Sequence, residues 1–441
     1  MPFRLLMVLA CFGAQMVVAL VTVPPWQNPD EPQHLMAVRQ VLAYGPYDRF
    51  DSLEPGAERA IVASMIRYQW WEHYGRETPN PAPTSFQDGP AKVVRAYFGP
   101  PDGGSRLYYR FVASLFNAAH VEDLLAQLYV MRALSAIFAM LTLGCVWVGT
   151  QTMLDRRSAL VVSAIVALQP QFVLVSTTAG PDALVNLAGG VFWWRAATLL
   201  TREVTGLRAA WLLAAGIAAF LIRRMGAPLV LVALGATAAR LWPELNGTRP
   251  RRVTTALGLS VVGVALVVIA WSLLPAEVHR AFAWIQFDPV QSITGIVSRA
   301  GGLPGFVETL FTTFWLSAGW LRYYGPAWWY GVTLVVSLVA AAGVLAPRVE
   351  SVAERRARLL ALAMFTLQVA VVVAFYFGIL QTSPQGRYLF PVLPAIVSLL
   401  WLGWRRWFAA HEQPGAAVSL IAIVGVLNIA AWVLVIAPAY P

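Results

Sequence analysis

The stretch AVSLIAIVGVLNIAAWVLVIA, residues 417–437, contains no charged side chain and is long enough to cross a lipid bilayer as a single helix. Apolar runs like it recur along the chain, which has 441 residues, of which 58% are hydrophobic and only 12% are charged. Soluble domains carry roughly twice that share of charge. The sequence therefore predicts an all-α polytopic membrane protein.

About eleven membrane-spanning helices are predicted from these runs. Arginines in short loops fall alternately to one side of the spans, which identifies that side as cytoplasmic. They share one side only if the run 306–320 does not cross, so this run is expected to be a re-entrant or interfacial helix on the outer side. The predicted spans are 5–23, 126–153, 158–178, 182–200, 208–222, 226–241, 254–274, 327–346, 358–380, 388–404 and 417–437.

The spans are expected to form a single domain, 1–441, with two large segments on the outer side. The first is the loop 24–125, and the second is the segment 275–325. The net charge of +10 is attributed to arginines retained on the cytoplasmic side rather than to nucleic-acid binding. Cys11 and Cys145 both lie in apolar runs, so neither a disulfide framework nor a metal-binding cysteine pair is predicted.

The run Asn28–His34, NPDEPQH, follows the first span directly and is the most informative polar motif. A carboxylate at Asp30 or Glu31, where the chain leaves the bilayer, has the basicity to accept a proton from an attacking hydroxyl. His34 lies one helical turn beyond Asp30 and can share its face. The alternative is structural, because Asp30 and Gln33 have the spacing of a capping box for a helix that ends near Tyr44.

Three further polar positions interrupt apolar runs on the outer side. Asp182 opens the fourth span, either as a functional acid or as a charge favoured by the helix dipole. Arg223 and Arg224 lie in a short turn against the positive-inside bias, and they suit a lipid phosphate or ordinary headgroups.

The segment 385–391, QGRYLFP, stands before the tenth span. Gly386 is expected to let the backbone approach a ligand, and Arg387 offers a bidentate donor for a phosphate. Gln385 and Tyr388 flank that arginine, although a membrane-interface anchor of Arg and Tyr explains the pair equally well.

In this order, these motifs resemble the GT-C superfamily of membrane glycosyltransferases. More closely, the chain is similar to an uncharacterised bacterial family of GT-C-like predicted membrane proteins, a domain of unknown function. The matching residues cover nearly the whole chain and are Pro29–His34, Leu107–Tyr109, Arg132–Ser135, Pro170 with Asp182, Arg224, and Gln385–Tyr388 with Pro391.

The resemblance implies a GT-C-like bundle in the cytoplasmic (inner) membrane, with an active site facing the periplasm or exterior. It implies Asp30 as the catalytic residue, with Glu31 beside it, and a polyprenyl-phosphate sugar as the donor. The acceptor would be a cell-envelope glycan, lipid or protein, and a single displacement would invert the anomeric centre. His34, Tyr109, Asp182, Arg223, Arg224, Gln385, Arg387 and Tyr388 are the expected substrate-binding residues.

No cofactor is predicted, and the spacing of Asp30, Glu31, His34 and Asp182 allows a divalent metal without requiring one. The chain departs from the superfamily in having arginines where a lysine is common, and Gly180-Pro181 before Asp182. Two other classes of function stay open: a transporter or flippase for lipid-linked glycans, and a non-catalytic partner in a cell-envelope assembly.

Overall fold

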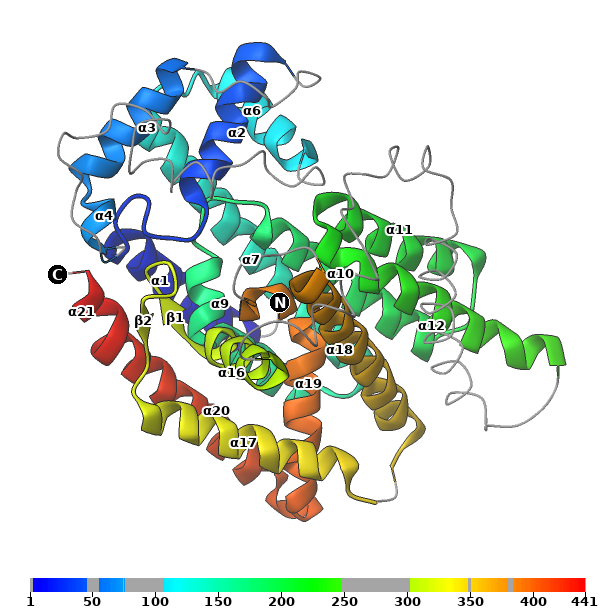
Figure 1. The fold of residues 1–441 in the computed structure, drawn as a ribbon. Helices are drawn as coiled ribbons and strands as arrows, with labels where there is room; N and C mark the ends of the chain where they lie inside the picture. The colour runs from blue at the N-terminus through cyan, green and yellow to red at the C-terminus, as the bar shows by residue number, and fades with distance from the viewer. Residues whose placement is uncertain are drawn as a thin grey trace.

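The computed structural model describes residues 3–45, 55–73, 75, 106–246, 302–347, 350–378 and 384–440. In these ranges the fold is a bundle of helices with one two-stranded antiparallel hairpin (Figure 1). The predicted span 254–274 and residues 275–301 of the second outer segment lie outside the described residues. The elements are α1 (Phe3–Thr22), α2 (Glu31–Tyr44), α3 (Pro55–Arg67), α4 (Trp70–His73), α6 (Arg106–Ala119), α7 (Leu124–Met153), α8 (Arg156–Leu168), α9 (Pro170–Val175), α10 (Asp182–Thr201), α11 (Gly206–Ile222), η3 (Arg224–Gly226), α12 (Ala227–Asn246), α16 (Gly302–Trp315), β1 (Ser317–Ala318), β2 (Tyr323–Tyr324), α17 (Ala327–Leu345), α18 (Val352–Gly378), η5 (Gly386–Val392), α19 (Leu393–Trp404), η6 (Arg405–Trp407), η7 (Ala410–Glu412), α20 (Gln413–Ala431), η8 (Trp432–Ile436) and α21 (Ala437–Ala439).

Seven helical segments of the described chain are long and apolar enough to cross a membrane, which confirms the all-α polytopic fold of an integral membrane protein. The count of about eleven spans stays a prediction, because it also includes α11, α12, the α8–α9 segment and 254–274. α16 has 14 residues, fewer than the ~20 that a membrane-spanning helix needs. The seven segments are Phe3–Thr22, Leu124–Met153, Asp182–Thr201, Ala327–Leu345, Val352–Phe377, Gly386–Trp407 and Ala410–Ala439.

The predicted span 158–178 is interrupted. α8 ends at Leu168 and α9 begins at Pro170, because proline has no N–H to continue the ladder of helix hydrogen bonds. The side chain of Gln169 takes over at the break, accepting from the backbone N–H of Phe172 and donating to the carbonyl of Phe314. The break therefore ties α9 to the end of α16.

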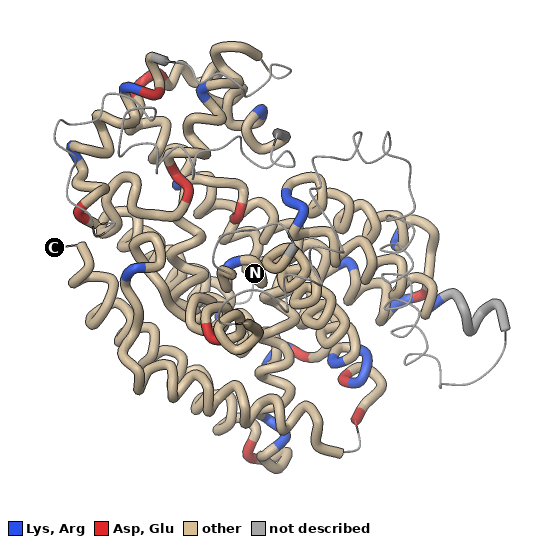
Figure 2. The backbone as a smooth tube through the Cα atoms, viewed as in Figure 1, with Lys and Arg blue, Asp and Glu red and all other residues tan. Residues whose placement is uncertain are grey.

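Several arginines that were predicted to share one side lie together at one end of the bundle. At one end of the bundle, which we call the arginine-rich end, Arg358 and Arg406 pair with Glu350, while Arg405 pairs with Glu354. Charged residues lie mainly near helix ends and loops, and α17 and α20 are uncharged along almost all of their length (Figure 2). The opposite end, the site end, is where α1, α9 and α11 finish and α10 begins.

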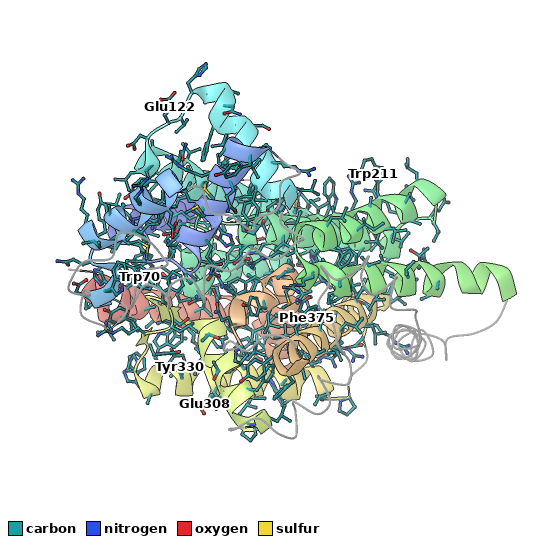
Figure 3. The ribbon with its side chains drawn as sticks, turned by 45° about the horizontal axis from the view of Figure 1, so that its top comes forward. Trp70, Glu122, Trp211, Glu308, Tyr330 and Phe375 are labelled. Atoms are coloured by element: carbon teal, nitrogen blue, oxygen red, sulfur yellow. The ribbon has the colours of Figure 1, made fainter. Side chains whose placement is uncertain are left out.

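Four helices of the first loop, α2, α3, α4 and α6, form a cap over the site end (Figure 1). Trp70 of α4 (Figure 3) makes an edge-to-face contact with Trp320 in the β1–β2 turn, with ring centroids 5.6 Å apart. The Trp320 indole donates to the carbonyl of Trp26 at 2.9 Å. The cap is thus attached to the bundle by a turn from the second half of the chain.

A close crossing of α10 and η5 sets the spacing of the bundle beneath the site. A Cβ atom at Gly189 would overlap the backbone carbonyl of Pro391, so only glycine allows this approach. Small residues at such crossings are typical of helix packing in membranes. The crossing brings the start of α10 and the start of η5 to the same end of the molecule.

Gly189→Ala is expected to destabilise the protein by about 2 kcal/mol, because the added methyl group overpacks a backbone contact. Gly144→Ala on α7 is the matched control, since nothing lies within 4 Å of its added Cβ. Apparent melting temperatures in detergent test the pair, and equal melting of both variants would contradict the close crossing.

Candidate functional site

The short linker between α1 and α2 carries the predicted acids in an unusual backbone conformation. Trp26 and Asp30 have φ of 72° and 64°, in the left-handed region that non-glycine residues rarely adopt. The Trp26 indole donates to the Ser64 hydroxyl at 2.9 Å. Such strain, of the order of 1–3 kcal/mol per residue, persists only where the surroundings fix it, and it is common at functional sites.

Glu31 fixes this linker from below. Its carboxylate is fully buried and forms a bidentate pair with Arg132 of α7, with Nε–Oε1 at 2.7 Å and Nη2–Oε2 at 2.8 Å. The backbone N–H groups of Trp26 and Ala179 and the Asn28 amide also donate to it, at 3.1–3.3 Å. These donors occupy both oxygens of Glu31, so its carboxylate holds the linker here, and a catalytic role for Glu31 stays a prediction.

Arg132 was not among the expected site residues. Its remaining donors bind the carbonyls of Val23 and Pro24 at 2.8 Å, so it holds the end of α1 as well as Glu31. An arginine inside a long apolar helix is a signal that could have revealed the pair, because such a charge requires a buried partner.

Asp30 makes a different contact. It stands at the N-cap position of α2, but its side chain makes no capping hydrogen bond, so the capping-box reading is wrong. Arg387 of η5 donates to its Oδ2 instead. Burial by itself would raise the pKa of this carboxyl, but the charge of Arg387, with contributions from His34 and Arg223, holds the pKa below its ordinary value.

Arg387 joins the two predicted acids. Its Nη1 lies 3.3 Å from Oδ2 of Asp182, while Arg223 pairs with Oδ1 of the same aspartate. The four side chains form an alternating chain of charge, Asp30–Arg387–Asp182–Arg223, contributed by the linker, η5, α10 and the end of α11. The chain is electrically neutral, and the Arg387 side chain is only 4% exposed.

His34 lies beside this chain. Its Nδ1 is 2.7 Å from the hydroxyl of Tyr109 on α6. Burial lowers the pKa of His34 to about 4, against the opposing effect of the Asp30 carboxylate. A Cβ atom at Gly180 would lie 2.6 Å from the imidazole Cδ2. Glycine at 180, noted above as a departure from the superfamily, thus makes room for this ring.

Some of the other predicted residues belong to the chain of charge, and others pack against the residues that form it. Arg224 is buried with its guanidinium 5.4 Å from the ring centroid of Phe375 on α18 (Figure 3). Its neighbour Arg223 is the one that pairs with Asp182. The side chain of Arg387 lies over the Tyr388 ring at 5.6 Å from the centroid.

Gly386 does not serve the role expected from sequence. A Cβ there would overlap the backbone of Phe314, and the Gly386 N–H donates to the Thr313 hydroxyl at 2.7 Å. The glycine therefore brings η5 against α16, which orients the adjacent Arg387.

A small cavity adjoins Arg387, with room for about one water molecule. The Nε of Arg387 is buried and has no hydrogen-bond partner within the described residues. This cavity is far smaller than a sugar, so it is not by itself a sugar-binding pocket. The lining residues are Pro29, Gln171, Thr313, Ser317, Ala318, Trp320, Leu321, Gln385 and Arg387.

In this arrangement arginines, rather than a cation, pair with the acids. Arg387 occupies the position between Asp30 and Asp182 that a shared cation would take, and Glu31 is committed to Arg132. Among the residues described, no group of three His, Cys, Asp or Glu side chains has metal-binding geometry.

No protein-family model and no curated protein matches this chain. Three similar solved structures are the oligosaccharyltransferase of Archaeoglobus fulgidus with Zn and sulfate, the same protein in the apo form, and its AglB with an inhibitory peptide and a dolichol-phosphate. Their identities are 14%, 14% and 12%, with TM-scores of 0.43, 0.45 and 0.45. The matches cover 96%, 100% and 97% of this chain and 52%, 56% and 55% of theirs. The chain thus spans about half the length of these proteins.

The two adjacent acids should differ in how much stability the protein loses when each is neutralised. Glu31→Gln is expected to lower the unfolding free energy by about 3 kcal/mol, because it leaves Arg132 buried without a counter-charge. Asp30→Asn should cost less than about 1 kcal/mol, since asparagine tolerates the left-handed conformation and Arg387 keeps Asp182.

Denaturation of the two variants in detergent measures this difference. A stability loss for Asp30→Asn as large as that of Glu31→Gln would show that Asp30 is a structural residue.

Proposed function

We propose that the chain is a GT-C-type glycosyltransferase that uses a polyprenyl-phosphate sugar as donor at the outer face of the cytoplasmic membrane. The observation that carries the proposal is the chain Asp30–Arg387–Asp182–Arg223 at one end of a membrane-spanning bundle. It combines an ionised carboxylate with two arginines, the groups that a hydroxyl nucleophile and a leaving phosphate need. The acceptor is a cell-envelope glycan, lipid or protein.

In the proposed reaction, Asp30 accepts the proton of the acceptor hydroxyl as its oxygen attacks the anomeric carbon. The bond from that carbon to the phosphate oxygen breaks, and polyprenyl phosphate leaves with the electron pair. Arg387 and Arg223 stabilise the negative charge that grows on the phosphate. One displacement on the face opposite the leaving group inverts the anomeric centre.

Donor binding would also activate the base. At rest, Arg387 lowers the pKa of the Asp30 carboxyl and so weakens it as a base. A phosphate that draws Arg387 away removes this effect, and the remaining burial raises the basicity of Asp30. The unpartnered Nε of Arg387 is one donor available to that phosphate.

The other residues would position these groups. Glu31 and Arg132 hold the linker, and His34 with Tyr109 forms the neutral wall beside Asp30. Asp182 orients both arginines, and Gln385, Tyr388 and Arg224 complete the surroundings of η5.

Asp30→Asn is expected to reduce sugar transfer at least ~10³-fold while donor binding persists, because the variant keeps the arginines but loses the base. The measurement is release or transfer of sugar from a panel of polyprenyl-phosphate sugars by detergent-purified protein. Arg224→Gln is the comparison for Arg223→Gln, which should impair transfer more, because Arg223 is the one of these two that pairs with Asp182 in the described residues.

Wild-type protein that binds these lipids without ever turning them over would overturn the proposal. A transporter or a non-catalytic partner would then explain the chain better.

The pH profile of transfer gives an independent check. The pH dependence of kcat/KM reports the free enzyme. There His34 stays neutral down to about pH 4 and Asp30 stays ionised below its ordinary pKa, so kcat/KM for the donor should be flat from pH 7 to 5 and fall near 4. His34→Gln should remove the contribution of His34 to that fall. A half-loss of the wild-type rate near pH 6.5 would mean that His34 titrates as an exposed histidine.

A further inference from the structure

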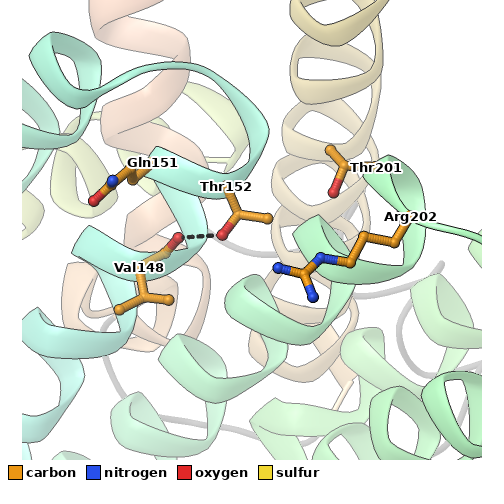
Figure 4. A pocket seen from close by; sticks show the side chains of 5 residues that line it. All are labelled: Val148, Gln151, Thr152, Thr201 and Arg202. Carbon is orange, nitrogen blue, oxygen red and sulfur yellow. Dashed lines mark hydrogen bonds between the residues drawn. The ribbon is translucent and has the colours of Figure 1, made fainter.

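A pocket of about 440 Å³ opens at the arginine-rich end, on the side of the bundle away from Asp30. The last turns of α7 and α10 form it, and Arg202 extends across it towards the α7 turn that carries Thr152 (Figure 4). The Thr152 hydroxyl donates to the carbonyl of Val148 at 2.7 Å. The lining residues are Val148, Gln151, Thr152, Thr201 and Arg202, so most of the wall is polar.

Two more arginines reach the same helix end. Arg240 of α12 donates from Nη2 to the backbone carbonyl of Arg202 at 2.9 Å, and Arg356 of α18 donates from Nη1 to that of Leu200 at 2.6 Å. The carbonyl end of a helix attracts cations, which explains why Arg240 and Arg356 each donate one hydrogen bond to the end of α10. Arg240 and Arg356 thus bring two like charges to the last turn of α10.

These arginines lack the counter-charges that others at this end have. Within the described part of the chain, no carboxylate lies within 4.0 Å of Arg202, Arg240 or Arg356, whereas Arg358 and Arg405 each have a glutamate. The Nε of Arg240 is buried and has no hydrogen-bond partner among the described residues. Clustered guanidinium groups with donors to spare are stabilised by an anion, and phosphate fits their fork geometry.

We infer that this pocket binds a phosphate group through Arg202 in its wall and through Arg240 and Arg356 at the same helix end, and that the phosphate belongs to an anionic phospholipid of the adjoining leaflet. The pocket wall continues into apolar surface, because Val148 and Leu141 of α7 and Trp211 of α11 are 40–53% exposed. A headgroup at this position would sit at the membrane interface with its acyl chains along that surface. Basic pockets between helices hold lipid headgroups by this combination of charge and apolar contact.

The test is native mass spectrometry of the full chain in detergent, titrated with phosphatidylglycerol and, separately, phosphatidylcholine. Wild type should prefer phosphatidylglycerol, and Arg240→Gln/Arg356→Gln should weaken that binding by roughly tenfold, from the loss of two charges. Arg355→Gln removes the same charge from the exposed neighbouring position of α18 and should bind as wild type does.

Gln151→Glu keeps every arginine but adds a carboxylate to the pocket wall, so it should also weaken the binding of phosphatidylglycerol. If the double variant does not fold, Gln151→Glu alone tests whether the pocket binds the lipid. Inorganic phosphate distinguishes the source: competition at millimolar concentration would support the site but assign it to a free phosphate ligand. Equal binding of the two lipids without competition by phosphate, or an equal loss in Arg355→Gln, would overturn the inference.

Discussion

The buried pair of Glu31 and Arg132 is the interaction on which the site depends. Two fully buried charges are tolerated only when hydrogen bonds satisfy them, and here the linker, α7 and the segment before α10 all contribute. The pair fixes the path of the chain between α1 and α2. That path in turn holds Asp30 in a left-handed conformation with its carboxylate directed to Arg387 rather than to the N-terminus of its own helix. The adjacent acids thus have separate tasks, one structural and one facing the site.

Charge balance explains how four ionised groups persist together at the site end of the bundle. Two carboxylates and two guanidinium groups alternate, so each buried charge has an opposite neighbour and the set is neutral. Opposite charges in contact stabilise each other more strongly where water is scarce. An incoming anion must share the arginines with the aspartates, and this exchange couples ligand binding to the properties of Asp30.

The sequence was sufficient for the fold class, and it named several residues that the structure brings together. Apolar runs located the spans, and Asp30, His34, Tyr109, Asp182, Arg223 and Arg387 do meet at one end of the bundle. Short sequence patterns gave wrong predictions where a residue far away in the chain determines the contact. The capping-box spacing of Asp30 and Gln33 is real, but Arg387 takes the carboxylate, and Gly386 serves packing against α16 rather than a ligand. Sequence spacing also could not tell which of Arg223 and Arg224 would reach Asp182.

The separation of Asp30 and Arg387 along the chain has a consequence for biogenesis. The two residues are 357 positions apart, and Trp320, which attaches the cap to the linker, is also encoded late. During synthesis, Asp30 and Asp182 therefore reach the membrane surface long before η5 exists. Until then, of the two arginines in this chain of charge, only Arg223 is present to balance the two acids. The nascent protein must keep the two carboxylates hydrated at the membrane surface. The site therefore assembles only when η5 packs into the bundle, late in synthesis.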